Sequence, residues 1–72
     1  MNKRITSDPK ICGGEPCVTN TRIPASIILS HLAAGESYDE ILKQFPRLTK
    51  EDIFAVLDYA AYLSTEKVLS IG

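Results

Sequence analysis

Residues 11–24 read Ile-Cys-Gly-Gly-Glu-Pro-Cys-Val-Thr-Asn-Thr-Arg-Ile-Pro. Glycines, prolines and an Asn-Thr-Arg turn crowd this stretch, which is typical of short extended segments joined by tight turns. We expect Ile11 and Cys12 to be extended on one side of a Gly-Gly-Glu-Pro loop, and residues 17–19 on the other. Asn20 suits a second turn because asparagine tolerates a left-handed backbone, and residues 21–23 should then be extended again. The pattern predicts an N-terminal β-hairpin or arm.

Helical periodicity follows this arm. Apolar spacing predicts three helices, over residues 24–34, 38–45 and 50–64. Pro24 fits the first position of the first helix, and Gly35 ends it. Ser37 and Glu40 form a capping box for the second helix, and Thr49 caps the third, whose first turn carries two acids. Residues 4–6 are compatible with a short strand.

These elements predict a mainly α fold in a single domain, residues 1–72. It consists of an extended arm over residues 1–23, a three-helix body over residues 24–64 and a tail over residues 65–72. The apolar residues of the tail, Leu69 among them, are compatible with an extension of the third helix or with a strand on a partner.

Size and charge limit the classes of function. A domain of 72 residues buries only about 60% of its unfolded surface, so self-association or a partner is a common remedy. The net charge of −1 gives no general attraction to nucleic acid, and a DNA contact would need a local basic patch. Apolar runs are too short to span a membrane, and the N-terminus lacks the apolar segment of a signal peptide. We expect a cytoplasmic protein with no membrane partner.

Catalytic and metal chemistry have little support. Cys12 and Cys17 are the only cysteines, and without a secretion signal we expect reduced thiols, although a disulfide across the intervening turn is geometrically possible. His31 is the only histidine, so a zinc site would lack ligands. A thiol enzyme with His31 as base is the alternative, but the pattern is not specific. We therefore expect no enzyme, metal or cofactor.

The third helix is unusually apolar. From Ile53 to Leu63 every residue except Asp58 is apolar, which predicts burial on all sides. The predicted core stripe comprises Ile53, Val56, Leu57 and Ala60, with Ala55 on a flank. Two short helices cannot cover such a helix, so we expect a protein partner, either a second copy or another chain; the alternative is that the arm covers one flank. The candidate interface residues are Phe54, Tyr59, Tyr62 and Leu69.

A helix-turn-helix is possible at two places, because short turns at residues 35–37 and 46–49 join successive helices. The candidate DNA contacts are Arg22, Lys43, Arg47 and Lys50. Acidic residues at the starts of the second and third helices would repel phosphate, and a solvated charged rim is the competing interpretation. For Arg22, between arm and helix, a structural tie is favoured over a DNA contact.

The segment Gly13–Pro24 resembles the signature of the domain-of-unknown-function 433 family, and the match continues through residues 32–37 and 45–49. Two positions depart from the pattern: Glu15 stands where lysine is common, and Asn20 where glycine is usual. The first removes a positive charge from the arm. The second is mild, since asparagine also accepts a left-handed turn.

The resemblance implies a small helix-turn-helix protein related in fold to homeodomain-like modules. Many such proteins are thought to be antitoxins of type II toxin–antitoxin pairs, encoded beside a PIN-like ribonuclease toxin. The resemblance implies no catalytic residues in this chain. We therefore expect an antitoxin-like homodimer that binds a PIN-like toxin and operator DNA. The alternatives are an interaction module that binds no DNA and a stand-alone dimeric transcriptional regulator.

Overall fold

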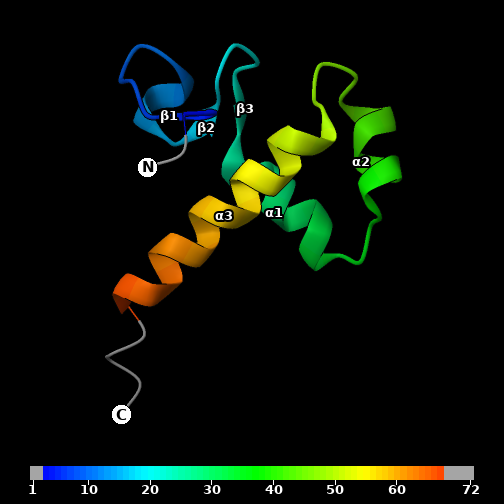
Figure 1. Ribbon diagram of the computed structural model, residues 1–72. Coiled ribbons are helices and arrows are strands. Elements are labelled where there is room, and N and C mark those ends of the chain that lie inside the picture. The colour runs from blue at the N-terminus through cyan, green and yellow to red at the C-terminus, as the bar shows by residue number, and fades with distance from the viewer. Residues whose placement is uncertain (1–2, 68–72) are drawn as a thin grey trace.

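Three helices and a small antiparallel sheet make up residues 3–67, the part of the chain that the computed structural model describes (Figure 1). The elements are β1 (Ile5–Thr6), a 3-10 turn η1 (Cys12–Gly14), β2 (Cys17–Val18), β3 (Ile23–Pro24), α1 (Ala25–Ala33), α2 (Tyr38–Gln44) and α3 (Lys50–Lys67). The prediction of a mainly helical fold with an N-terminal β arm is confirmed. Residue Leu69, a predicted interface residue, lies outside the described residues.

The sheet has the order β1-β2-β3, and its central strand pairs Val18 with both Ile5 and Ile23. Of the two extended pieces predicted about the Gly-Gly-Glu-Pro loop, Ile11 is extended and Cys17 and Val18 form β2, but Cys12 is not extended. Cys12, Gly13 and Gly14 all have a positive φ, so the chain reverses there instead of extending. The partner of β2 is therefore β1, which lies further back along the chain.

The turn between β2 and β3 differs from expectation in two ways. Asn20 is left-handed as predicted (φ 69°), but Arg22 is left-handed too (φ 59°), so of the predicted extended segment 21–23 only Ile23 belongs to a strand, β3. Pro24 is not the first residue of α1: with ψ 141° it belongs to β3 and precedes the helix as its N-cap. Pairing within the sheet keeps Pro24 out of the helix: Pro24 pairs with Cys17, and the N–H of Ala25 donates to the carbonyl of Pro16 (2.9 Å).

Local capping begins the other two helices, as predicted. Ser37 and Glu40 form a reciprocal capping box at α2. At α3, the Thr49 N–H donates to Asp52 Oδ2 (3.0 Å) and the Asp52 N–H donates to Thr49 Oγ1 (3.2 Å). Helix α3 ends at Lys67 rather than Ser64, so the first residues of the predicted tail extend the helix.

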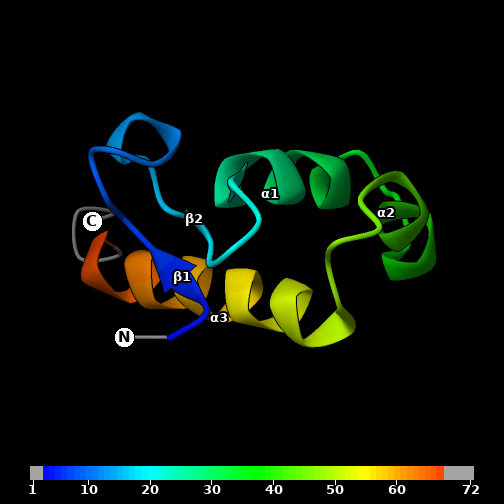
Figure 2. The same ribbon diagram turned by 90° about the horizontal axis from the view of Figure 1, so that it is seen from above.

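The core lies where the three helices meet the sheet. Ile28, Ile41, Ile53 and Val56 are fully buried there, one or two from each helix. Ala55, on the flank of the predicted stripe, is only 3% exposed, which agrees with the alternative that the arm covers one flank of the helix. The physical reason is that β1 packs against α3 and covers this flank, as Figure 2 shows from above. Leu57, predicted in the core stripe, is only half-buried.

Candidate functional site

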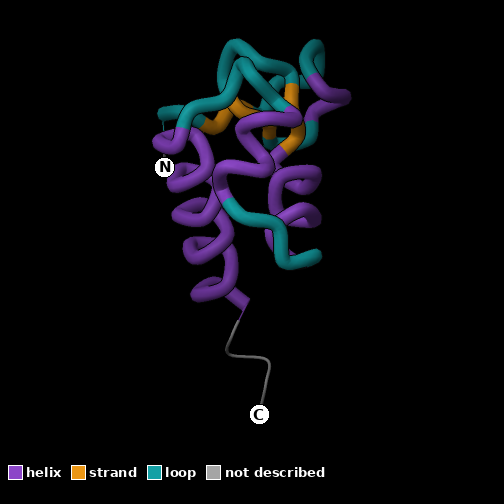
Figure 3. Tube along the Cα trace, turned by 90° about the vertical axis from the view of Figure 1, so that its right-hand side faces the viewer, coloured by secondary structure: helices purple, strands orange, loops and turns teal. Residues whose placement is uncertain are grey.

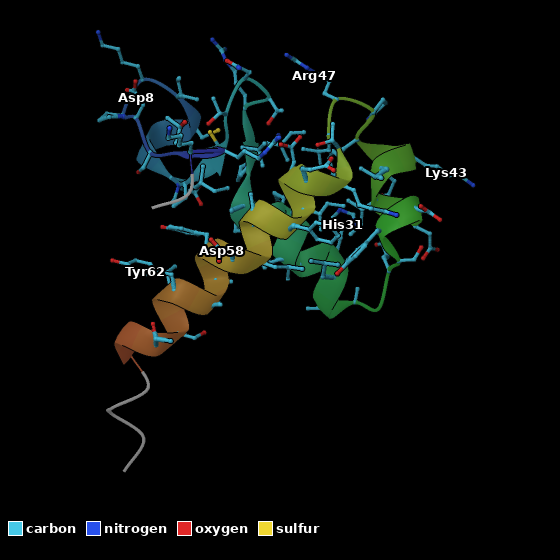
Figure 4. The ribbon with its side chains drawn as sticks, viewed as in Figure 1. Asp8, His31, Lys43, Arg47, Asp58 and Tyr62 are labelled. Atoms are coloured by element: carbon cyan, nitrogen blue, oxygen red, sulfur yellow. The ribbon has the colours of Figure 1, made fainter. Side chains whose placement is uncertain are left out.

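The C-terminal half of α3 extends beyond α1 and the sheet (Figures 1 and 3). In this half Tyr62 is 52% exposed and Leu63 36% exposed, whereas Tyr59 packs partly against the core. Their spacing of three and four residues places the three side chains on one helical face. We refer to Tyr59, Tyr62 and Leu63 as the α3 C-terminal patch. Figure 4 shows Tyr62 projecting from this half of the helix, away from α1 and α2.

The position of Leu63 explains why the patch is open. It follows Val56 by seven residues, close to two helical turns, and so lies on the same side of α3. Val56 is fully buried in the core. Leu63 is partly exposed, because α3 extends beyond the other helices. The core-facing stripe of α3 thus continues past the core that covers it. Leu63 was not among the predicted interface residues, although its seven-residue spacing from Val56 indicated that it lies on the same apolar stripe.

Phe54 belongs to a different surface. It is 48% exposed at the start of α3 and packs edge-on against Tyr38 of α2, with ring centroids 5.6 Å apart. The structure therefore does not bring Phe54 together with Tyr62, although both were predicted interface residues. Tyr38 was not predicted, and its spacing in α2 offered no signal for a contact with another helix.

The four candidate DNA contacts are all exposed and come from four different segments. Arg22 lies in the β2–β3 turn, Lys43 in the last turn of α2 and Lys50 at the start of α3. Arg47, between α2 and α3, donates from Nη2 to the carbonyl of Asn20 (2.6 Å) and so reaches the turn that holds Arg22. Lys43 projects away from this group (Figure 4).

Acidic side chains interrupt these basic positions. Glu51 follows Lys50 in the first turn of α3 and is exposed, and Asp39 and Glu40 are exposed at the start of α2. Asp52 is instead 7% exposed and pairs with Arg4 (2.9 Å). The surface around α2 and the start of α3 is therefore of mixed charge, which weakens attraction to phosphate.

His31 lies in the last turn of α1, on the side toward α2 (Figure 4), and its partners give it a structural role. Its Nδ1 is 2.7 Å from Oε2 of Glu36, whose other oxygen accepts from Gln44, and its ring meets Phe45 edge-on. The bond from His31, followed by that from Gln44, holds the pKa of Glu36 below its ordinary value. Together these contacts join α1, the following loop and the end of α2.

An open cavity of about 200 Å³ adjoins this pair and is lined by Ser30, His31, Ala34 and Glu36. The histidine there is committed to a carboxylate, and the cysteines are engaged elsewhere: Cys12 donates from Sγ to the carbonyl of Arg22 (3.2 Å). These contacts do not assemble the thiol–imidazole pair that a thiol enzyme needs. Within residues 3–67 no three metal-ligating side chains gather, and no helix is long and apolar enough to cross a bilayer.

The fold and its surfaces define a small, mainly helical module that carries a β arm and an exposed helix end. The sequence profile of the family described as protein of unknown function (DUF433) matches residues 5–60. The chain belongs to this family.

Two relatives show how far the likeness extends. The uncharacterized protein y4eO of Sinorhizobium fredii is 39% identical over 56 residues, which are 78% of this chain but 25% of that protein. The crystal structure of a DUF433 member from Anabaena variabilis superposes with a TM-score of 0.74 and 31% identity, over 94% of this chain and 63% of that one. This chain therefore spans a quarter of the one relative and less than two thirds of the other.

Proposed function

We propose that this chain is a cytoplasmic, antitoxin-like protein that binds a PIN-like ribonuclease toxin through the α3 C-terminal patch. The observation that carries the proposal is the continuation of the core-facing stripe of α3 beyond the core, at Tyr59, Tyr62 and Leu63. Tyrosine and other large side chains are frequent anchors of protein interfaces. A partner that buries this patch would complete a core that a chain of this size leaves short. Toxin inhibition would be steric, by covering the nuclease cleft.

For DNA binding we propose that α2 and α3, joined by residues 45–49, act as the helix-turn-helix. In a homodimer, two copies of Arg22, Lys43 and Lys50 would contact phosphates on either side of an operator. All three side chains are exposed, which supports this assignment. Arg47 contributes differently, because its bond to the Asn20 carbonyl ties the arm to the helices.

The partner proposal is tested by co-expressing the chain with the product of its neighbouring gene, followed by size exclusion with light scattering. A stable complex and rescue of growth from the toxin are expected. Leu63→Asp should disrupt the complex, since it places a charge in the patch. Ser64→Asp is the matched control: it adds the same charge at the adjacent exposed position on another face of α3 and should leave the complex intact. Equal complex formation by both variants would contradict the assignment of the patch.

A second function, an interaction module that binds no DNA, is favoured by the exposed acids beside the basic residues, Glu51 among them. Titration of operator binding with salt separates the two functions. If Lys43 and Lys50 contact phosphates, each alanine variant lowers the salt slope by about one. Absence of binding at low salt, with or without the neighbour product, would favour the module, and binding without any partner would favour the stand-alone dimeric regulator.

A further inference from the structure

The first half of α3 carries an exposed surface of its own, separate from the α3 C-terminal patch. Lys50, Phe54 and Asp58 follow one another at intervals of four residues, so their side chains lie on one face of the helix, and all three are exposed. Helix α1 packs against α3 along one side (Figure 2), and the fully buried Ile53 and Val56 lie on other faces. We refer to Lys50, Phe54 and Asp58 as the outer face of α3.

Phe54 is held in position at the centre of this face. Its ring packs edge-on against that of Tyr38, with an angle of 76° between the ring planes, and Tyr38 itself packs against the core. A side chain that is 48% exposed and already fixed by a neighbour loses little conformational entropy when a partner covers it. Aromatic side chains are also enriched at the centres of protein interfaces. Phe54 therefore has the properties of an interface anchor.

Charges of opposite sign flank the Phe54 ring along the helix. Lys50 lies about one turn before it and Asp58 about one turn after it. Lys50 forms no ion pair within residues 3–67. A two-fold axis that passes through Phe54, perpendicular to the helix, reverses the order of the three residues. It places Lys50 opposite the partner's Asp58, and Asp58 opposite the partner's Lys50, with the two Phe54 rings in contact on the axis. The outer face is therefore complementary to itself.

We propose that the outer face of α3 is the self-association surface of this chain, which pairs two copies of the helix antiparallel across Phe54. The proposal rests on the homodimer that the proposed operator binding requires, and it assigns the surface that makes this dimer. Nucleic acid and an anionic membrane fit the face less well, because both would meet the carboxylates of Asp58 and of Glu51 beside it. The Lys50 ammonium has three donors, so pairing with one carboxylate leaves donors for a phosphate at the edge of the dimer.

The length of the overlap sets the strength of this dimer. From Lys50 to Asp58 the helix rises about 12 Å, so the two copies overlap over about two and a half turns. Even with Tyr38 beside it, a contact this short buries less than the roughly 800 Å² per partner of a standard interface. We therefore expect a dimer that dissociates in the micromolar range. The α3 C-terminal patch lies beyond the overlap and stays accessible to another protein.

Sedimentation equilibrium of the full chain alone, from micromolar to near-millimolar concentration, tests the proposal. The wild type should be a reversible dimer, and Phe54→Asp should weaken it about tenfold or more, because the anchor is lost and two carboxylates meet on the axis. Ile27→Asp is the matched control: it makes the same change at a residue of α1 that is 41% exposed and lies outside the outer face. A monomeric wild type, or an equal effect of the two substitutions in chains that circular dichroism shows to be folded, would overturn the proposal.

Charge reversal tests the antiparallel register and leaves the ring in place. Lys50→Glu puts like charges opposite each other at both ends of the contact and should weaken the dimer about fivefold or more. Asp58→Lys should do the same, and the double variant should restore the wild-type dissociation constant. Both positions are exposed, so this result does not depend on whether Phe54→Asp folds. A double variant that dimerises no better than either single variant would overturn the proposal.

These measurements separate the proposal from the proposed function, because they contain neither toxin nor DNA. A dimer that forms through Phe54 but binds neither the neighbour product nor operator DNA would contradict the proposed function alone. A complex with the toxin formed by a chain that is monomeric throughout would contradict the self-association surface alone.

Discussion

Asp52 joins two distant parts of the chain through its two carboxylate oxygens. One oxygen accepts from the backbone N–H of Thr49 (3.0 Å) and so begins α3, and the other accepts from Arg4 Nη1 of the arm (2.9 Å). A carboxylate that is only 7% exposed is costly unless it is paired in this way. The same residue thus serves helix capping and tertiary structure.

Asp52→Ala should lower the free energy of unfolding by about 2–3 kcal/mol, because it removes a helix cap and leaves the Thr49 N–H without its acceptor. Urea denaturation followed by circular dichroism measures this. The control is Glu51→Ala, at an exposed acid in the same first turn, which should change stability by no more than about 0.5 kcal/mol. Similar losses in both variants would mean that helix-dipole effects, and not the contacts of Asp52, dominate.

Glu36 should make stability depend on pH. Hydrogen bonds from His31 and Gln44 lower the pKa of Glu36 in the folded state, so the unfolded chain binds a proton more readily than the folded one. The stability that this carboxylate contributes is present above the ordinary glutamate pKa and is lost as the pH falls through the lower, folded-state pKa.

Glu36→Gln tests this, because an amide does not titrate. The difference in unfolding free energy between wild type and variant should be present at neutral pH and shrink toward zero in acid, as measured by urea titrations at several pH values. Asp39→Asn, at an exposed carboxylate, serves as the control and should show a smaller change. A difference that stays constant with pH would contradict the role of the Glu36 carboxylate.

At the scale of elements, α3 consists of two halves with different environments. Its first half is packed against the arm and the other helices, where Ile53 and Val56 are fully buried. Its second half extends beyond them and presents Tyr62 and Leu63 to solvent. Hydrophobic burial therefore stabilises the first half, whereas the second is available for a partner.

Substitutions in the two halves should separate stability from binding. Ile53→Val is expected to reduce the unfolding free energy by about 0.5–1.5 kcal/mol, because it leaves a small void in a packed core. Leu63→Ala should change it by less than about 0.5 kcal/mol and yet weaken the complex with the neighbour product. Thermal denaturation and isothermal titration calorimetry measure the two effects. A loss of stability in Leu63→Ala as large as in Ile53→Val would show that the patch belongs to the monomer core.

At the scale of the whole molecule, polar ties hold the arm to the helices in addition to apolar contacts. Arg4 reaches α3 through Asp52, and Arg47 reaches the β2–β3 turn through the Asn20 carbonyl. The two ties lie at different places along the arm. The hydrogen bond from Arg47 to the Asn20 carbonyl sets how the turn that holds Arg22 is placed relative to α2 and α3. A surface that combines Arg22 with residues of these helices therefore depends on this bond.

Arg47→Ala should loosen this turn. We expect a loss of about 0.5–1.5 kcal/mol from the missing hydrogen bond and faster exchange of the Thr21 amide, which donates to the Val18 carbonyl within the turn. Hydrogen exchange followed by NMR measures both effects. Lys43→Ala removes an exposed cation of α2 that projects elsewhere and should leave the exchange rates unchanged. Equal exchange in both variants would mean that apolar packing alone positions the turn.

Features that depend on neighbouring residues could be predicted from the sequence. The starts of α2 and α3 follow from capping boxes in which the partners are three residues apart, as with Ser37 and Glu40. The left-handed Asn20 follows from its own side chain, and exposure of the candidate residues Lys43 and Lys50 follows from their charge. Such interactions form within one turn of the chain, so the sequence pattern is sufficient to locate them.

Tertiary structure alone decided the features that join distant residues. The pairing of β2 with β1, the burial of Ala55, and the bond from Arg47 to the carbonyl of Asn20, 27 residues away, depend on how the arm packs against the helices. The pairing of Arg4 with Asp52, 48 residues apart, is of the same kind. Periodicity describes which side of a helix is apolar, but not which element covers it or where that cover ends. The open patch at Leu63 exists for this reason: α3 keeps its apolar stripe beyond the point where the rest of the body stops.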